Sequence, residues 1–314
     1  MSTLLPFGFS STALDVVQGV DATGRHVIIT GAASGIGAET ARAVAHTGAS
    51  LTMAVRSVDA GRLVAAELTA ATGNQRIDVR QLDLSDLTSI AEFVDGWSGP
   101  LHVLVNNAGI MATPESRSSQ GWECQFATNH LGHAALTSGL HAALANANGA
   151  RVVNVSSIGH RRSPVVFDDI HFTNRPYDKW SAYGQSKTAN VLHAVGISQR
   201  WADDGITANA LHPGGIMTNL QRHMDPTEFE AMGWVDADGN LQKGFKTAQQ
   251  GAATTTMLAM SPLVDGVSGQ YFEDCNQAVP ATPDDRSRGV QQYALDPEQA
   301  QRLWDYSISA LANA

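Results

Sequence analysis

The chain has 314 residues, of which 43% are hydrophobic and 16% are charged, and its formal net charge is −10. This composition is typical of a compact globular protein and excludes a disordered or fibrous chain. The negative charge makes nucleic acid and anionic membranes poor default partners, because proteins that bind a phosphate backbone normally present a basic surface.

Short apolar runs alternate with helical patterns along the chain. The runs that predict strands are 25–30, 51–56, 75–82, 101–105, 151–156, 206–211 and 269–272. One helix is expected from the glycine turn to about 47. Further helices are expected over about 59–71, 86–97 and 182–202, and a long helix is expected to begin near 119. Strands that are apolar throughout are buried on both faces, and alternation with helices requires parallel crossovers.

The sequence therefore predicts an α/β fold, a single doubly wound parallel sheet with helices on both faces. One such domain accounts for residues 21–314. An N-terminal arm is expected over 1–20, and an insertion is expected at about 219–246.

A glycine-rich turn, TGAASGIG at 30–37, lies between the first expected strand and helix. Gly31 permits the tight turn, Gly35 lets the backbone approach a pyrophosphate, and Gly37 allows close helix–strand packing. The pyrophosphate would rest on the helix N-terminus. The spacing differs from Gly-x-Gly-x-x-Gly, and a glycine turn needed only for folding is the alternative. The expected cofactor contacts here are Gly31, Ser34, Gly35, Ile36 and Gly37.

The end of the second strand indicates which dinucleotide binds. An acid there suits the ribose 2′-hydroxyl of NAD, and an Arg suits the 2′-phosphate of NADP. This strand ends at Arg56 with no acid at its tip. A guanidinium can bind a phosphate with two hydrogen bonds. The sequence favours NADP(H), leaves NAD(H) open, and leaves a solvated surface arginine as the alternative.

Two further strand ends carry small or polar residues. The fourth strand ends in NNAG at 106–109, where small residues let the backbone pass a cofactor ribose and Asn side chains can connect strands. Asp83 and Leu84 close the third strand and suit an adenine pocket. As isolated fragments, both are ordinary turn sequences.

Tyr183 and Lys187 are four residues apart, which places them on one face of an expected helix. A phenol has a reference pKa of about 10, so it is a poor base near neutral pH unless nearby positive charge favours the phenolate. It could then exchange a proton with a substrate oxygen. This pair is weak alone, and gains weight from Ser156-Ser157 at the end of the fifth strand and from the glycine turn.

These motifs together resemble the short-chain dehydrogenase/reductase family. TGAASGIG, NNAG, the strand-end SS, YGQSK at 183–187 and PGGIMT at 213–218 occur in the family's order and spacing, over about residues 20–312. AVR at 54–56, NHLGH at 129–133 and GVSGQYF at 266–272 are similar to the retinol-dehydrogenase-like branch, which includes the oxidoreductase part of the WW-domain oxidoreductase. The resemblance implies a Rossmann fold.

The resemblance also implies roles for individual residues. Tyr183 would be the general acid/base, and Lys187 would lower its pKa and hold the nicotinamide ribose. Ser157 would hydrogen-bond the substrate oxygen. Asn129 would support the active-site helix and a water-linked proton path. The remaining implied cofactor contacts are Asn107, Ala108, Gly109, Pro213, Gly214 and Thr218. Gly215 doubles the glycine after Pro213, and Ser34 replaces a basic residue or Asn found in some NADP-preferring members.

The insertion is rich in apolar residues, which suit either a substrate lid or the packing face of a small helix pair. The family places its substrate loop here. The candidate substrate-pocket residues are His160, Trp180, Met217 and Trp234.

No metal site is expected. His130 and His133 are three residues apart but have no acidic or thiolate partner nearby in sequence, and the two cysteines, Cys124 and Cys275, form no metal motif. No Lys or Arg precedes Arg25, so the basic segment of a secretory signal is missing, and no apolar run reaches the ~20 residues of a membrane span. We therefore expect a cytoplasmic protein without a membrane span.

The residues and the resemblance together predict an NADP(H)-dependent oxidoreductase that interconverts an alcohol and a ketone or aldehyde on an apolar substrate. A reductase of conjugated C=C bonds and a non-catalytic NADP-sensing regulator are the alternatives. Family members usually pair through the long helices expected near 119 and 182, so the resemblance implies a homodimer or homotetramer.

Overall fold

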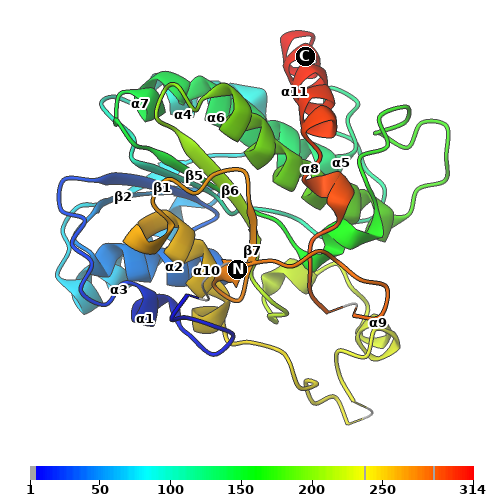
Figure 1. Ribbon diagram of the computed structural model, residues 1–314, viewed down its shortest axis with the longest axis horizontal. Helices are drawn as coiled ribbons and strands as arrows, with labels where there is room; N and C mark the ends of the chain where they lie inside the picture. Colours follow the sequence, from blue (N-terminus) through cyan, green and yellow to red (C-terminus); the bar gives the residue numbers. More distant parts are fainter. Residues whose placement is uncertain (1–4, 237, 286) are drawn as a thin grey trace.

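The computed structural model describes residues 5–236, 238–285 and 287–314, and within them eight strands form one sheet (Figure 1). Their order is β3-β2-β1-β4-β5-β6-β7-β8, and all neighbours are parallel except β7 and β8. The predicted doubly wound parallel sheet is confirmed, and the antiparallel edge strand β8 is the addition. The strands are β1 (His26–Thr30), β2 (Ser50–Val55), β3 (Ile77–Gln81), β4 (Val103–Asn106), β5 (Arg151–Val155), β6 (Thr207–His212), β7 (Tyr271–Glu273) and β8 (Asn276–Gln277).

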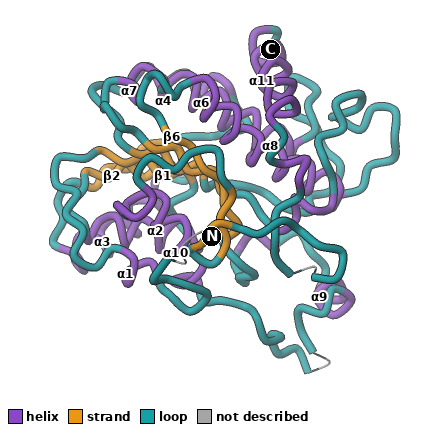
Figure 2. The backbone as a smooth tube through the Cα atoms, in the orientation of Figure 1, coloured by secondary structure: helices purple, strands orange, loops and turns teal. Residues whose placement is uncertain are grey.

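Helices cover both faces of the sheet (Figures 1 and 2). One layer contains α1 (Ala13–Val16), α2 (Gly35–His46), α3 (Val58–Thr72) and α10 (Ala248–Met260). The other contains α4 (Leu87–Asp95), α5 (Cys124–Phe126), α6 (Gly132–Gly139), α7 (His141–Ala145), α8 (Lys179–Arg200) and α11 (Pro297–Ala312). The short helix α9 (Pro226–Ala231) lies apart from both layers, in the region of the expected insertion (Figure 1). None of the described helices is both long and apolar enough to cross a bilayer.

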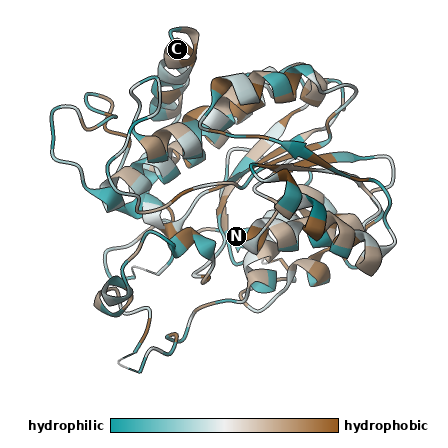
Figure 3. Ribbon diagram, turned by 180° about the vertical axis from the view of Figure 1, so that it is seen from behind, coloured by the Kyte–Doolittle hydropathy of each residue, from teal (hydrophilic) through white to brown (hydrophobic). Residues whose placement is uncertain are grey.

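The alternation of side chains along each strand supplies two cores. Val27 and Ile29 of β1 belong to the core under α2 and α10, and Ile28 belongs to the core under α4 and α8. The sheet accordingly contains brown, hydrophobic stretches of strand (Figure 3). Thr30 ends β1, Asn106 ends β4 and His212 ends β6, so these strands carry polar residues at the carboxyl ends beside which the site forms.

The helix α8 is enclosed by its own chain. Residues 182–197 are all buried, because α11, β5, β6 and the 3₁₀ turn η2 (Ile158–Arg162) pack around it. The resemblance implies that subunits pair partly through this helix. A homodimer or homotetramer stays a prediction, and residues 182–197 have no exposed side chains with which to contact a second subunit.

Helix capping explains two differences in element boundaries. The helix expected near 119 begins at Cys124, because the Glu123 carboxylate accepts the N–H groups of Gln125 and Phe126 at 2.9 and 2.7 Å. The helix expected at 182 begins earlier, at Lys179, where the carboxylate of Asp178 caps it. Boundaries set by such caps are harder to predict than the elements themselves.

The expected N-terminal arm is partly helical. It contains α1, whose Ala13 and Val16 are buried against the layer that includes α10. Residues 1–4 of this arm and residue 237 of the expected insertion lie outside the described residues.

We predict that Gly132→Ala destabilises the protein. Helix propensity alone would favour Ala by about 0.5–1 kcal/mol. A Cβ at Gly132, however, would lie 2.2 Å from the backbone oxygen of Leu84. Overpacking of this kind lowers the free energy of unfolding by about 1–3 kcal/mol, which urea denaturation measures. Gly8→Ala, whose Cβ would meet nothing within 4 Å, is the control; equal stability of the two variants would contradict the packing argument.

Candidate active site

A large cavity lies at the carboxyl ends of the parallel strands. Its volume is about 1460 Å³, and residues following β1, β2, β4, β5 and β6 line it together with residues of α8. The order of the strands reverses between β1 and β4, which is where open α/β sheets bind their ligands. Pockets for one small molecule are roughly 300–1,000 Å³, so this cavity has room for a cofactor and a substrate together.

The glycine turn adopts the conformation expected of an anion-binding loop. Gly31 and Gly35 have φ angles of +67° and +54°, which favour glycine. A Cβ at Gly37 would lie 2.3 Å from the Gly31 carbonyl oxygen and 2.6 Å from Asn107 Nδ2. The hydroxyl of Ser34, at the N-cap of α2, makes no capping hydrogen bond. The first N–H groups of this twelve-residue helix therefore suit a phosphate at the cavity wall.

The ends of β1 and β4 are joined by Thr30. Its Oγ1 accepts the backbone N–H groups of Asn107 and Ala108, each at 2.9 Å. The Asn107 side chain returns a hydrogen bond to the Thr30 carbonyl oxygen at 2.8 Å. These bonds fix the backbone of 107–109 along the cavity, beside the glycine turn.

Arg56 and Asp83 lie in the cavity wall after β2 and β3. Arg56 is exposed. The Asp83 carboxylate accepts the backbone N–H and the hydroxyl of Ser85 at 2.9 and 2.6 Å. This part of the wall thus contains the guanidinium of Arg56 and the carboxylate of Asp83, and that carboxylate is already hydrogen-bonded within its own turn.

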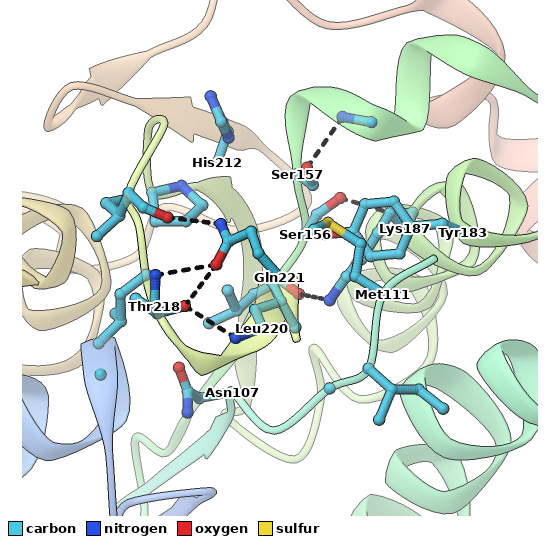
Figure 4. Close-up of a pocket in the computed structure, with 18 of the residues that line it drawn as sticks. Asn107, Met111, Ser156, Ser157, Tyr183, Lys187, His212, Thr218, Leu220 and Gln221 are labelled. Atoms are coloured by element: carbon cyan, nitrogen blue, oxygen red, sulfur yellow. Dashed lines mark hydrogen bonds between the residues drawn. The ribbon is translucent and has the colours of Figure 1, made fainter. Parts of the chain in front are cut away.

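The opposite part of the wall carries Ser157, Tyr183 and Lys187 (Figure 4). Lys187 Nζ lies 5.8 Å from the centre of the Tyr183 ring and donates a hydrogen bond to the Val155 carbonyl oxygen at 3.0 Å. Ser157 Oγ accepts the Gly159 N–H at 2.9 Å. A serine hydroxyl, a phenol and an ammonium group therefore face one space.

Burial shifts the titration of two of these groups. It raises the pKa of Tyr183 to about 12, although a hydrogen bond with Ser157 acts in the opposite direction. Burial also lowers the pKa of Lys187 to about 8. The polypeptide by itself therefore does not give Tyr183 the lowered pKa that the resemblance implies. Positive charge beyond that of the protein has to offset the effect of burial on this pKa.

Asn129 lies behind this wall and does not line the cavity. It belongs to the π-helical turn η1 (Ala127–Leu131), a form often found at functional sites. Its Oδ1 accepts the Ile110 N–H, and its Nδ2 donates to the Ile110 carbonyl oxygen and to Ser186 Oγ, each at 2.9 Å. Asn129 thus connects the segment after β4 to α8.

The structure brings two of the four substrate-pocket candidates into the cavity. Trp180 and Trp234 line it, with ring centres 6.4 Å apart. Met217 does not line it, and its side chain is exposed. His160 does not line it either. Its side chain is fully buried behind Ser157 and is hydrogen-bonded to the Ser157 carbonyl oxygen. The cofactor residues expected from the sequence all line the cavity.

Several cavity residues were missed by the sequence reasoning. Arg161, Arg162 and His212 line it, together with Pro283, Ser287 and Gln291 from the segment after β8. The guanidinium of Arg161 holds that segment by donating to the carbonyl oxygens of Thr282 and Asp285, each at 2.7 Å. No local sequence signal marks such a distant contact, although His212 directly precedes Pro213.

Gln221 was also missed. Its Oε1 accepts the Thr218 N–H at 2.9 Å, and its Nε2 donates to the Ile216 carbonyl oxygen at 2.8 Å (Figure 4). These bonds fix the turn after β6 against the cavity. The Thr–x–x–Gln spacing of a capping box is the signal that could have identified it.

Across the described residues, no group of three His, Cys, Asp or Glu side chains is arranged to hold a metal ion. His130 and His133 are instead buried, with hydrogen bonds to Ser307 and Thr30.

Comparison with known proteins gives consistent relatives. The short chain dehydrogenase family model matches residues 25–228. A "Probable oxidoreductase" of Streptomyces antibioticus is 52% identical and covers 94% of this chain and 100% of its own length. Human retinol dehydrogenase 11 is 37% identical, covering 93% of this chain and 87% of its own.

Solved structures agree. A Mycobacterium paratuberculosis protein matches with a TM-score of 0.74 and 34% identity, covering 96% of this chain and 97% of its own. A Beutenbergia cavernae protein described as an NAD(P)-dependent gluconate 5-dehydrogenase with bound NADP matches with a TM-score of 0.63 and 26% identity, over 80% of this chain and 95% of its own. The chain therefore belongs to the short-chain dehydrogenase/reductase family of oxidoreductases, and its relatives include the retinol-dehydrogenase-like branch.

Proposed function

We propose that the protein is an NADP(H)-dependent oxidoreductase that interconverts an alcohol and a ketone or aldehyde on an apolar substrate. The observation that carries the proposal is that Ser157, Tyr183 and Lys187 share one cavity with the glycine turn and Arg56. One wall suits the reacting oxygen of a substrate, and the other suits a phosphorylated dinucleotide.

The chain's own residues would each act at a defined place. The glycine turn, Asn107 and the turn after β6 would hold the dinucleotide, which supplies or accepts a hydride when bound. Tyr183 would give a proton to, or take one from, the substrate oxygen, and Ser157 Oγ would hydrogen-bond that oxygen. The ammonium of Lys187, together with the positive charge of an oxidised nicotinamide ring when one is bound, would offset the burial that raises the pKa of Tyr183. Asn129 would hold the segment after β4 against α8 through its hydrogen bonds with Ile110 and Ser186.

The preference for NADP(H) rests on Arg56. Its exposed guanidinium stands at the tip of β2, where a 2′-phosphate would lie and where no carboxylate of β2 would repel it. The Beutenbergia cavernae structure, which contains NADP, supports the same choice.

The apolar character of the substrate rests on the cluster around Tyr183. Met111, Ala112, Tyr183 and Met224 are buried together, and Trp180, Leu220, Phe229, Met232 and Trp234 pack against them. Lys179 at the start of α8 pairs with Glu228 of α9 at 2.6 Å, which holds this part of the insertion near the cavity. We infer that residues 219–246 act as a substrate lid on a single domain spanning 21–314.

We predict that Tyr183→Phe lowers the rate of carbonyl reduction by ~10²–10⁴-fold, because the general acid is removed. The assay follows NADPH oxidation with a panel of apolar aldehydes, ketones and quinones, and identifies the products. Affinity for NADPH, measured by fluorescence titration, should change little. Tyr306→Phe is the matched control, since its hydroxyl bonds His171 away from the cavity. Unchanged turnover in Tyr183→Phe, or a saturated product with its carbonyl intact, would contradict the proposal.

We predict that Arg56→Asp moves the cofactor preference from NADP(H) towards NAD(H). It removes a charged hydrogen bond, worth about 1.5–3 kcal/mol, and adds repulsion, so NADPH should bind at least tenfold more weakly. The measurement is the ratio of kcat/KM for NADPH and NADH. Arg62→Asp makes the same charge change on the exposed surface of α3 and should leave the ratio unchanged. An unaltered ratio in Arg56→Asp would remove this argument.

We predict that NADPH binding to the free protein weakens as pH rises through about 8. The pKa of Lys187 is lowered to about 8 by burial, so its ammonium charge is present below that pH and lost above it. Tyr183, with a pKa of about 12, stays protonated in this range. Fluorescence titrations from pH 7 to 9.5 should show about a tenfold rise in Kd, consistent with the ~1.5 kcal/mol of a charged hydrogen bond. Lys187→Met should bind weakly at every pH, and a retained pH dependence in this variant would exclude Lys187 as its source.

A further inference from the structure

Two buried histidines contact the peptide bond that follows Ser157, from opposite sides. His160 Nδ1 lies 2.7 Å from the Ser157 carbonyl oxygen. His212 Nδ1 lies 3.1 Å from the Ile158 nitrogen, which donates its N–H to that ring. One histidine therefore binds the C=O of this peptide and the other binds its N–H. Figure 4 shows His212 and Ser157 at the wall of the same cavity.

The hydrogen bonds determine the tautomer of His160. The backbone N–H of Gln291 donates to its Nε2 at 3.1 Å, so Nε2 carries no hydrogen. The hydrogen of the neutral ring is then on Nδ1, where it points at an acceptor, the Ser157 oxygen. The backbone N–H of His160 donates to the same oxygen at 3.0 Å. His160 thus binds the Ser157 carbonyl oxygen twice.

His212 must have the opposite tautomer. Its Nδ1 accepts the Ile158 N–H, so the hydrogen of the neutral ring is on Nε2. Protonation of Nδ1 would set two hydrogens against each other and break the contact. Burial, with a contribution from Lys246 and His160, lowers the pKa of His212 to about 3. Burial and Arg161 lower the pKa of His160 to about 4 against the opposing bond with Ser157, so both rings stay neutral near pH 7.

Both histidines are anchored in the body of the fold. The carbonyl oxygen of His160 accepts the hydroxyls of Thr188 on α8 and Tyr293 at 3.0 and 2.7 Å. Its ring packs on Tyr271 of β7, with the ring centres 5.0 Å apart. His212 is the last residue of β6. The peptide after Ser157 is therefore connected to α8, β6, β7 and the segment that contains Gln291.

The peptide that the histidines hold also fixes the serine side chain. The Ser157 backbone is extended, and its Oγ accepts the N–H of Gly159 at 2.9 Å. Rotation of the Ser157–Ile158 peptide would displace Gly159 and break this bond. A Cβ at Gly159 would lie 2.8 Å from the Tyr183 ring, so the backbone that Ser157 Oγ binds passes close to that ring.

We propose that His160 and His212 are positioning residues that clamp the Ser157–Ile158 peptide and thereby place the Ser157 hydroxyl beside Tyr183. The inference rests on the proposed function, in which Ser157 binds the substrate oxygen. Neither ring touches the reacting atoms in this role. His160 acts through the carbonyl oxygen of Ser157, and His212 acts through the next N–H.

Four single variants test the clamp. His160→Leu and His212→Leu remove the hydrogen bonds, whereas His160→Asn and His212→Asn keep an amide that can donate or accept near the position of Nδ1. With NADPH and phenanthrenequinone as the probe substrate, kcat of the Leu variants should fall roughly 10- to 100-fold, since a shift of ~1 Å in a reacting group can lower the rate 10²-fold. The Asn variants should recover most of this loss, with the Kd for NADPH changed less than twofold in all four.

A double-mutant cycle separates positioning from general destabilisation. In a Ser157→Ala background, the Leu substitutions should lower kcat no further, because the group they position is absent. His193→Leu is the control: it removes another buried histidine, which contacts Asn154, and its effect on kcat should be the same in both backgrounds. If the Leu effects add in full to that of Ser157→Ala, the clamp is wrong while the proposed function stands. If Ser157→Ala itself leaves kcat unchanged, the role proposed for Ser157 fails first.

The tautomers supply a test that needs no turnover. Nitrogen-15 NMR of the imidazole rings should show hydrogen on Nδ1 of His160 and on Nε2 of His212 in the wild-type protein at pH 7. The same pattern should persist in Ser157→Ala, because the clamp binds backbone atoms. The opposite tautomer at either histidine would overturn the proposal.

Discussion

The hydrogen bonds of Thr30 at the switch point of the sheet are the constraint on which the site depends. One hydroxyl oxygen accepts two consecutive N–H groups from the end of β4, and Asn107 binds back to the Thr30 carbonyl oxygen. Beyond these bonds, β1 leads through the glycine turn into α2, whereas β4 leads into the segment that precedes α5. Gly37 then has to be a glycine, because a side chain there would meet both Gly31 and Asn107. The glycine turn after β1 and the segment after β4 are thereby held side by side through hydrogen bonds between side chains and backbone.

The electrostatics of the cavity differ from those of the whole chain. The protein has a net charge of −10, yet Asp83 is the one acidic residue among the described residues that line the cavity. The basic residues in that lining are Arg56, Arg161, Arg162, Lys187, Arg222 and Lys243. A multiply anionic cofactor is thus attracted locally by a protein that repels anions overall. Burial lowers the pKa of Lys187, so part of this attraction depends on pH.

Sequence reasoning identified the parts of the site that depend on short spacings. The glycine turn, the segment 106–109 and the Tyr183–Lys187 pair each lie within one turn or one helix face, and the structure places them on one cavity. The places of the first seven strands along the chain followed from apolar runs that alternate with helices. His160 was expected in the substrate pocket, but its ring is buried by Tyr271, Gln291 and other contacts from distant segments. Contacts of that kind join residues more than a hundred positions apart, and no local pattern encodes them.

The enclosure of α8 by α11 has a consequence for synthesis of the chain. The last residue of α8 is Arg200, and α11 begins only at Pro297. At a translation rate of ~5–20 residues per second, roughly 5–20 s pass between the appearance of the two helices. During that interval, the side of α8 that α11 covers, including Leu192 and Val195, lacks the partner that covers it in the folded protein. An apolar side of α8 is therefore exposed in the nascent chain after the proposed catalytic residues Tyr183 and Lys187 have been made, and such exposed surface favours aggregation.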